Sequence, residues 1–193
     1  MTNMKSFEDI LVDDHTSIYE GVLDILMRKS IPERVHSASS DSDFIALHRH
    51  FAKSNDKTGF HELLSKTPQS AYHKMAISSN VNDRIIAAEH APHPILTKMV
   101  DDVNPHVKEK LAQHAPQFHE YMASDNAPSI RNVVAKNTSR HNVLHKLASD
   151  IDPRVATTAI NRAREVLSGN ALDDVEKTYK RAHPNGYNGD LFT

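Results

Sequence analysis

The chain has no cysteine, no tryptophan and only five glycines among its 193 residues. Without cysteine it cannot form a disulfide framework, a thiolate nucleophile or a cysteine-ligated metal centre. The scarcity of glycine and of aromatic residues disfavours β-rich folds and the glycine-rich loops that hold phosphates. No apolar run approaches the roughly 20 residues needed to cross a bilayer, and no signal peptide is apparent. We therefore expect a cytoplasmic protein that does not associate with membranes.

Charge of neither sign dominates, since 23 Lys and Arg face 25 Asp and Glu. This balance argues against a strongly basic arm and against an acidic mimic of nucleic acid. Acidic residues outnumber basic ones in residues 1–56, whereas the rest of the chain is nearly balanced.

No glycine occurs between Gly59 and Gly169, which predicts continuous helical packing over that stretch. Six of the seven prolines within it form two interleaved series with spacings of 23 to 25 residues: Pro68, Pro92 and Pro116, and Pro105, Pro128 and Pro153. Proline is well tolerated at the first position of a helix, and Asn104 and Asp152 are good N-caps. The spacing predicts two short helices in each repeat of about 24 residues.

Apolar side chains recur with the same period. The second helix of each repeat centres on one apolar residue, flanked by others at helical spacing: Met75, Met99, Met122 and Leu147. His119 is the one exception in this pattern. The first helices match one another in turn: Val107, Leu111 and Ala112, then Ile130, Val134 and Ala135, then Val155, Ala159 and Ile160. One copy earlier, Asp83 occupies the leading apolar position, and Phe60 and Leu64 suggest a degenerate first copy.

On these residues, the stretch from about Phe60 to Leu167 resembles the HEAT-like superfamily of helical repeats. Its short period and the sequence Asn104–Ala112 are most similar to the variant leucine-rich repeats. The resemblance implies an α-solenoid of short paired helices, some of them single 3₁₀ turns. We expect an all-α fold of four to five repeats without β-sheet. The most buried residues should include Met99, Leu111, Met122, Val134 and Leu147. The family motif carries no catalytic residues.

The ends of the chain differ from the repeats. We assign 1–56 to an acidic helical N-terminal cap or docking segment, 57–169 to the repeats, 170–182 to a C-terminal helix and 183–193 to a flexible tail. Helices are predicted at Ser6–Val12, Ser17–Arg28, Asp43–Lys53 and Leu172–Ala182, with a connector at Ser30–Ser42. The tail motif Asp190, Leu191 and Phe192 is similar to short acidic-Leu-Phe peptides that dock on sliding clamps. Disorder or docking onto the last repeat is the simpler interpretation.

Fourteen histidines raise the question of a metal site. His141 and His145 are four residues apart on one predicted helix, which can place two ligands on one face. No HExxH pattern or obvious third ligand accompanies them, so we expect no metal and no cofactor. His119 is interpreted as a buried structural histidine. Neighbours such as His61 and Glu62 diverge by about 100° on a helix and cannot form a dyad. We therefore predict that the chain is not an enzyme.

A basic residue follows the leading position of three first helices: Arg84, Lys108 and Arg131. Stacked helices lie about 8–10 Å apart, so this ladder could follow a nucleic-acid backbone, assisted by Lys74, Lys98 and Lys146. Alternatively, each cation pairs with the acidic end of the preceding repeat, Asp102 with Lys108 and Asp125 with Arg131, which leaves Asp150 without a partner. We favour the pairing. The sequence thus predicts a non-catalytic scaffold for a macromolecular partner, a protein in preference to a nucleic acid, with no small-molecule substrate.

Overall fold

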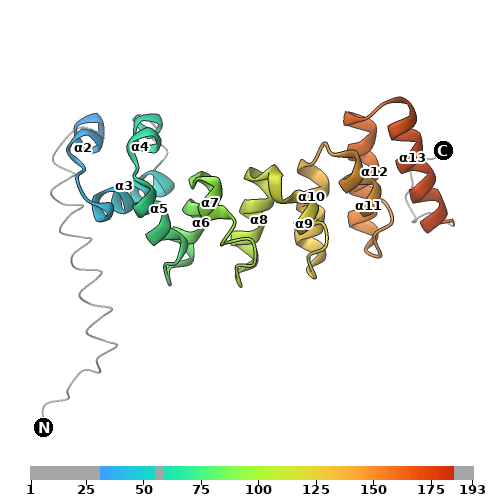
Figure 1. The fold of residues 1–193 in the computed structure, drawn as a ribbon, viewed down its shortest axis with the longest axis horizontal. Helices are drawn as coiled ribbons and strands as arrows, with labels where there is room; N and C mark the ends of the chain where they lie inside the picture. Colours follow the sequence, from blue (N-terminus) through green and yellow to red (C-terminus); the bar gives the residue numbers. More distant parts are fainter. Residues whose placement is uncertain (1–30, 55–58, 185–193) are drawn as a thin grey trace, which may run out of the picture. The chain divides into compact units, whose positions relative to one another are not determined.

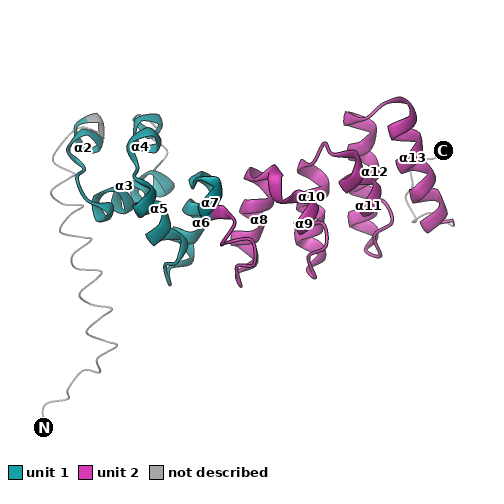
Figure 2. Cartoon of the chain, viewed as in Figure 1, with its two compact units in different colours: residues 1–95 teal, residues 96–193 magenta. Residues whose placement is uncertain are grey.

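The computed structural model describes residues 31–54 and 59–184, and these residues form helices and no β-strand (Figure 1). The all-α prediction is therefore confirmed for this part of the chain. The chain divides into two compact units, with the boundary after Ile95 (Figure 2). The predicted helices Ser6–Val12 and Ser17–Arg28 and the tail motif Asp190–Phe192 lie outside the described residues. Within the described ranges, no helix combines the length and the apolar character that a membrane crossing requires.

Unit 1 contains five helices in its described part: α2 (Ile31–Ser37), α3 (Asp41–Lys53), α4 (Phe60–Lys66), α5 (Gln69–Ala76) and α6 (Val81–His90). A short helix, α7 (His93–Leu96), follows at the boundary. The connector predicted at Ser30–Ser42 is wrong, because α2 occupies most of it. The serine-rich composition hid this helix, which buries Val35 and packs against α4.

Helix α3 begins two residues earlier than predicted, and its N-cap explains the difference. Ser40 and Asp43 form a capping box: the Asp43 amide donates to Ser40 Oγ at 3.2 Å, and the Ser40 amide donates to Asp43 Oδ2 at 2.9 Å. This exchange satisfies two amides that the first turn would otherwise leave unpaired, so the helix starts at Asp41.

Unit 2 contains the regular part of the sequence. Its helices are α8 (Pro105–His114), the 3₁₀ turn η1 (Pro116–Phe118), α9 (His119–Met122), α10 (Pro128–Asn137), α11 (His141–Leu147), α12 (Pro153–Val166) and α13 (Gly169–Ala182). Helix α10 packs against α8 and α12, and α13 packs against α11 and α12. Prolines stand in the first turn of α8, α10 and α12, as their spacing predicts. The predicted caps are present too, since Asn104 accepts from the His106 amide and Asp152 from the Arg154 amide, both at 2.9 Å.

The two glycines that bound the glycine-free stretch both stand at helix starts. Gly59 is the N-cap of α4 with φ 79°, and Gly169 opens α13 with φ 56°. Residues with a β-carbon rarely adopt such angles, so glycine is favoured at both positions. Helix α13 consequently begins at Gly169 and not at Leu172. It turns Val175 and Tyr179 into the core and exposes a polar outer face.

The core forms where the apolar pattern predicts it. Each of the five residues expected to be most buried is at most 3% exposed: Met99, Leu111, Met122, Val134 and Leu147. Small residues accompany them on the first helices, where Ala112, Ala135 and Ala159 are fully buried. Alanine adds little bulk beyond the backbone, so neighbouring first helices can pack closely.

Candidate functional site

Three loops of unit 2 join a second helix to the next first helix, and each begins with an aspartate that closes its own turn. Asp102 Oδ1 accepts from the Asn104 amide at 2.8 Å, Asp125 Oδ1 from the Ala127 amide at 2.8 Å, and Asp150 Oδ1 from the Asp152 amide at 2.9 Å. A side-chain oxygen that bonds the backbone two residues later stabilises a tight turn. The aspartates at the ends of the repeats are therefore turn formers.

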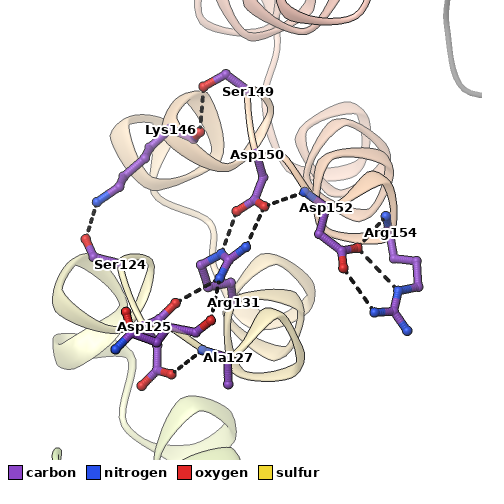
Figure 3. Close-up of polar contacts among 10 residues, drawn as sticks. Ser124, Asp125, Ala127, Arg131, Lys146, Ser149, Asp150, Asp152 and Arg154 are labelled. Atoms are coloured by element: carbon purple, nitrogen blue, oxygen red, sulfur yellow. Dashed lines mark hydrogen bonds and ion pairs between the residues drawn. The ribbon is translucent and has the colours of Figure 1, made fainter.

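Two of these aspartates, Asp125 and Asp150, also bind the ladder cations of unit 2, and Figure 3 shows Arg131 with Asp150. Lys108 Nζ lies 2.5 Å from Asp125 Oδ2. Arg131 makes a bidentate pair with Asp150, since Nε lies 2.7 Å from Oδ2 and Nη2 lies 2.7 Å from Oδ1. Its remaining nitrogen, Nη1, donates to the carbonyls of Asp125 at 2.9 Å and Asn126 at 3.2 Å. One guanidinium thus ties two consecutive loops together.

The inter-repeat pairing has the opposite direction to the predicted one. Arg131 pairs with the carboxylate of Asp150, 19 residues later, and takes only the backbone carbonyl of Asp125. Lys108 likewise reaches forward to Asp125. The prediction that Asp150 lacks a partner is wrong. In the preceding loop, Asp125 Oδ1 accepts from the backbone of the same loop, and the loop gives Arg131 only backbone carbonyls. The carboxylate that pairs with Arg131 therefore comes from Asp150 in the following loop.

The ladder pairs are shielded from water. The Arg131 side chain is 12% exposed and the Asp150 side chain 8%. Hydrogen bonding to Asp150 raises the pKa of the Arg131 guanidinium above its usual value, so the cation persists at any physiological pH. Arg84 occupies the same position in unit 1, where Nη1 donates to the carbonyls of Ser78 at 2.9 Å and Ser79 at 3.4 Å. The carbonyl contacts of the preceding loop are thus common to both arginines.

The predicted lysines of the second helices have separate surroundings. Lys74 pairs with Asp41 at 2.9 Å in unit 1. Lys146 contacts the hydroxyl of Ser124 in unit 2, and Lys98 is exposed. Within unit 2, the structure therefore brings Lys108 and Arg131 into one ion-paired series with Asp125 and Asp150, while Lys146 lies outside that series.

The same loops carry exposed apolar residues that the sequence pattern did not predict. Val103 is 94% exposed and Ile151 is 90% exposed, and each directly follows a loop aspartate. Tyr121 on α9 is also exposed and donates its hydroxyl to Asp101 Oδ1 at 2.8 Å. In the sequence, the only signal for these residues was an apolar residue between polar ones in two equivalent loops. We call Val103, Tyr121 and Ile151, with the ion-paired loops, the loop edge of unit 2.

The two histidines considered as metal ligands, His141 and His145, lie close to a carboxylate in the structure. His141 Nε2 lies 3.1 Å and His145 Nε2 lies 3.5 Å from Asp174 Oδ2 on α13, and His145 Nε2 lies 2.7 Å from the hydroxyl of Thr178. A shallow depression of about 460 Å³ adjoins this cluster. Its lining mixes charges: His141, Asn170, Ala171, Asp173, Asp174 and Lys177. Across the described ranges, no group of three or more ligand-type side chains has an arrangement that could hold a metal ion.

His119 is a structural residue, in agreement with its place in the apolar pattern. It is 1% exposed, and its Nε2 donates to the carbonyl of Ala112 at 2.8 Å. Burial lowers the pKa of His119 below the usual value, so the ring stays neutral near pH 7. His119 is therefore a neutral core residue whose one N–H group is used in a hydrogen bond.

Comparison with models of protein families, with curated proteins and with solved structures gave no match. The internal periodicity and the geometry of the loops are therefore the observations from which a function can be argued.

Proposed function

We propose that the chain is a non-catalytic scaffold of the HEAT-like repeat type, an α-solenoid closest to the variant leucine-rich repeats, that binds a protein partner in the cytoplasm. The proposed binding surface is the loop edge of unit 2. One observation carries the choice of partner: the two ladder cations of unit 2, Lys108 and Arg131, are already neutralised by the carboxylates of neighbouring loops.

Phosphate binding along the ladder would require these pairs to break. Arg131 uses all three of its nitrogens within the protein, and its carboxylate partner is almost fully buried. Withdrawing Arg131 would leave the charge of Asp150 uncompensated at low exposure, which is costly. A nucleic-acid binder instead presents cations that can exchange counterions for phosphates.

The exposed side chains of the loop edge suit a protein. Val103 and Ile151 project from loops that aspartate turns close, and the Arg131–Asp150 pair also holds the loop of Ile151. Rigid presentation lowers the entropy lost on binding, and apolar and tyrosine side chains are those that contribute most at protein interfaces. The stacking of short helices offers an extended surface, which suits a macromolecule better than a small substrate.

The test is affinity capture by the full chain from native extract, with and without nuclease. We expect a protein partner that survives nuclease and moderate salt. The double variant Val103→Ser/Ile151→Ser should weaken its binding about tenfold, equivalent to roughly 1.4 kcal/mol. Ile77→Ser is the matched control, because Ile77 is an exposed apolar residue of unit 1.

Recovery of nucleic acid alone would contradict the proposal and favour the alternative, binding along Arg84, Lys108 and Arg131. That alternative requires the triple alanine variant to stay folded and to lose the nucleic acid. It also requires the slope of log affinity against log salt to fall by about one unit for each phosphate that the variant no longer neutralises.

A further inference from the structure

His48 is enclosed at the centre of unit 1. It lies on α3 and is 1% exposed. Three rings from other helices surround it: Phe60 of α4 edge-on with centroids 6.3 Å apart, Tyr72 of α5 at 5.5 Å, and His90 of α6 stacked at 6.2 Å. The imidazole therefore fills the space where α3 meets three of its neighbours.

One hydrogen bond determines which nitrogen of His48 carries the proton. The Thr67 hydroxyl donates its only hydrogen to the carbonyl of Leu63 at 2.6 Å. Thr67 Oγ1, 2.9 Å from His48 Nε2, can therefore only accept, so Nε2 bears the hydrogen. His48 Nδ1 is then a bare acceptor, buried and without a hydrogen-bond partner among the residues that the structure describes.

No carboxylate on the described helices around α3 stands ready to stabilise a protonated His48. Asp83 of α6 is held in a bidentate pair by Arg49, and Glu62 and Lys66 of α4 pair with each other. The other ionisable groups on the helices packed against α3 are Tyr72, His73 and Lys74 of α5, Arg84, Glu89 and His90 of α6 and His61 of α4. Lys74 pairs with Asp41, and Glu89 lies beside His90, with 3.6 Å between Glu89 Oε2 and His90 Nε2. Burial first, and repulsion from His90 second, lower the pKa of His48 to about 4.

We propose that His48 makes the packing of α3 proton-dependent, so that acidification opens unit 1 at this helix. A proton added at Nδ1 places a charge in an apolar space where none of the described residues offers an acceptor, and separating α3 from α4, α5 and α6 restores hydration. The same helix buries Phe44, Leu47 and Phe51. Opening therefore exposes a large apolar surface at low pH.

The direction of the effect follows from proton linkage. An ordinary histidine titrates near pH 6.5. Below that pH, His48 is protonated in the open state but stays neutral in the closed state. The contribution of His48 to stability is complete above about pH 6.5 and is lost progressively as the pH falls towards 4. For a single site with these two values, the opening equilibrium should shift roughly 30-fold between pH 7.5 and pH 5.

Hydrogen exchange of the full chain tests the proposal. We expect the protection factors of the Leu47 and Phe51 amides, corrected for intrinsic exchange, to fall roughly 30-fold between pH 7.5 and pH 5. His48→Gln keeps a donor near the position of Nε2 but cannot be protonated, so most of this pH dependence should disappear. His73→Gln on α5 is the control, because His73 is exposed, and it should retain the effect.

Ring-labelled histidine resonances of the unmodified protein provide a second readout that does not depend on a folded variant. The His48 ring should stay neutral down to the pH at which α3 loses protection. A His48 ring that titrates near pH 6.5 while the α3 amides remain protected would overturn the proposal. Equal pH dependence in the unmodified protein and in His48→Gln would overturn it as well.

Discussion

The two units differ in the type of residue at the leading position of their first helices. In unit 2 this position is apolar and fully buried, as Val107, Ile130 and Val155 show. In α6 of unit 1 the same position is Asp83, which is 2% exposed. Arg49 of α3 binds it through Nε and Nη2 at 2.7 and 2.6 Å, and the Ser78 hydroxyl donates to it at 2.8 Å.

The difference shows how a regular array can accept an irregular neighbour. Consecutive first helices of unit 2 are nearly alike, so apolar packing and loop ion pairs suffice to align them. Helix α3 of unit 1 has a different pattern and packs against both α5 and α6. A buried ion pair is directional, so the Arg49–Asp83 pair can determine where α3 sits in a way that apolar contact alone cannot.

The largest expected effect comes from breaking this pair on one side. Arg49→Met leaves the Asp83 carboxylate buried without its cation and should destabilise the protein by about 3–5 kcal/mol in denaturant unfolding followed by far-UV circular dichroism. The double variant Arg49→Met/Asp83→Val gives unit 1 the apolar residue of unit 2 and should recover most of that loss. A double variant as unstable as the single one would show that the pair does more than replace apolar packing.

A smaller effect is expected from the ladder of unit 2. Arg131→Ala removes the bidentate pair with Asp150 and the two carbonyl contacts, and should cost about 1.5–3 kcal/mol in thermal or denaturant unfolding. Capture of a protein partner should weaken less than in Val103→Ser/Ile151→Ser, because Arg131 is little exposed and acts only by holding the loops. Arg154→Ala is a suitable control, since Arg154 pairs with Asp152 on the surface and exposes 80% of its side chain. Its loss should be within about 0.5 kcal/mol.

The smallest effect concerns the buried histidine of unit 2. Burial lowers the pKa of His119 below its usual value, so its contribution to stability also declines as the pH falls below about 6.5. For His119, the hydrogen bond to the Ala112 carbonyl opposes the lowering of the pKa, although repulsion from Arg140 adds to it; for His48, burial and repulsion from His90 both lower the pKa. Amides of α8 should therefore lose less protection than those of α3 between pH 7.5 and pH 5. Equal losses in α3 and α8 would contradict this distinction.

Much of the helical structure could be predicted from local sequence signals. Proline at a first turn, Asn104 and Asp152 as caps and apolar residues at helical spacing act within a few residues of one another. The predictions were wrong where a residue distant in the sequence determines the local structure. Helix α2 is stabilised by packing against α4, and Asp83 looked like an exception to the pattern until Arg49, 34 residues earlier, was placed beside it.

The candidate site also combines features that the sequence predicted with features that it did not. The ladder residues and the loop aspartates were identified from their period, but the direction of their pairing was predicted wrongly. The loop-edge residues Val103 and Ile151 were missed because an apolar residue in a loop can be buried or exposed with the same local sequence. The resemblance to HEAT-like and variant leucine-rich repeats remains a prediction, as do the absence of catalysis and the protein partner.

The sequence by itself determined where helices start, which of their faces are apolar and which positions recur, because backbone sterics, capping and periodicity depend on near neighbours. Only the tertiary structure decided that Arg131 reaches forward to Asp150, that Asp83 is buried against Arg49 and that His48 is sealed among three rings. These two ion pairs join residues that are 19 and 34 positions apart in the sequence. The distances between them in space are set by how the helices pack together.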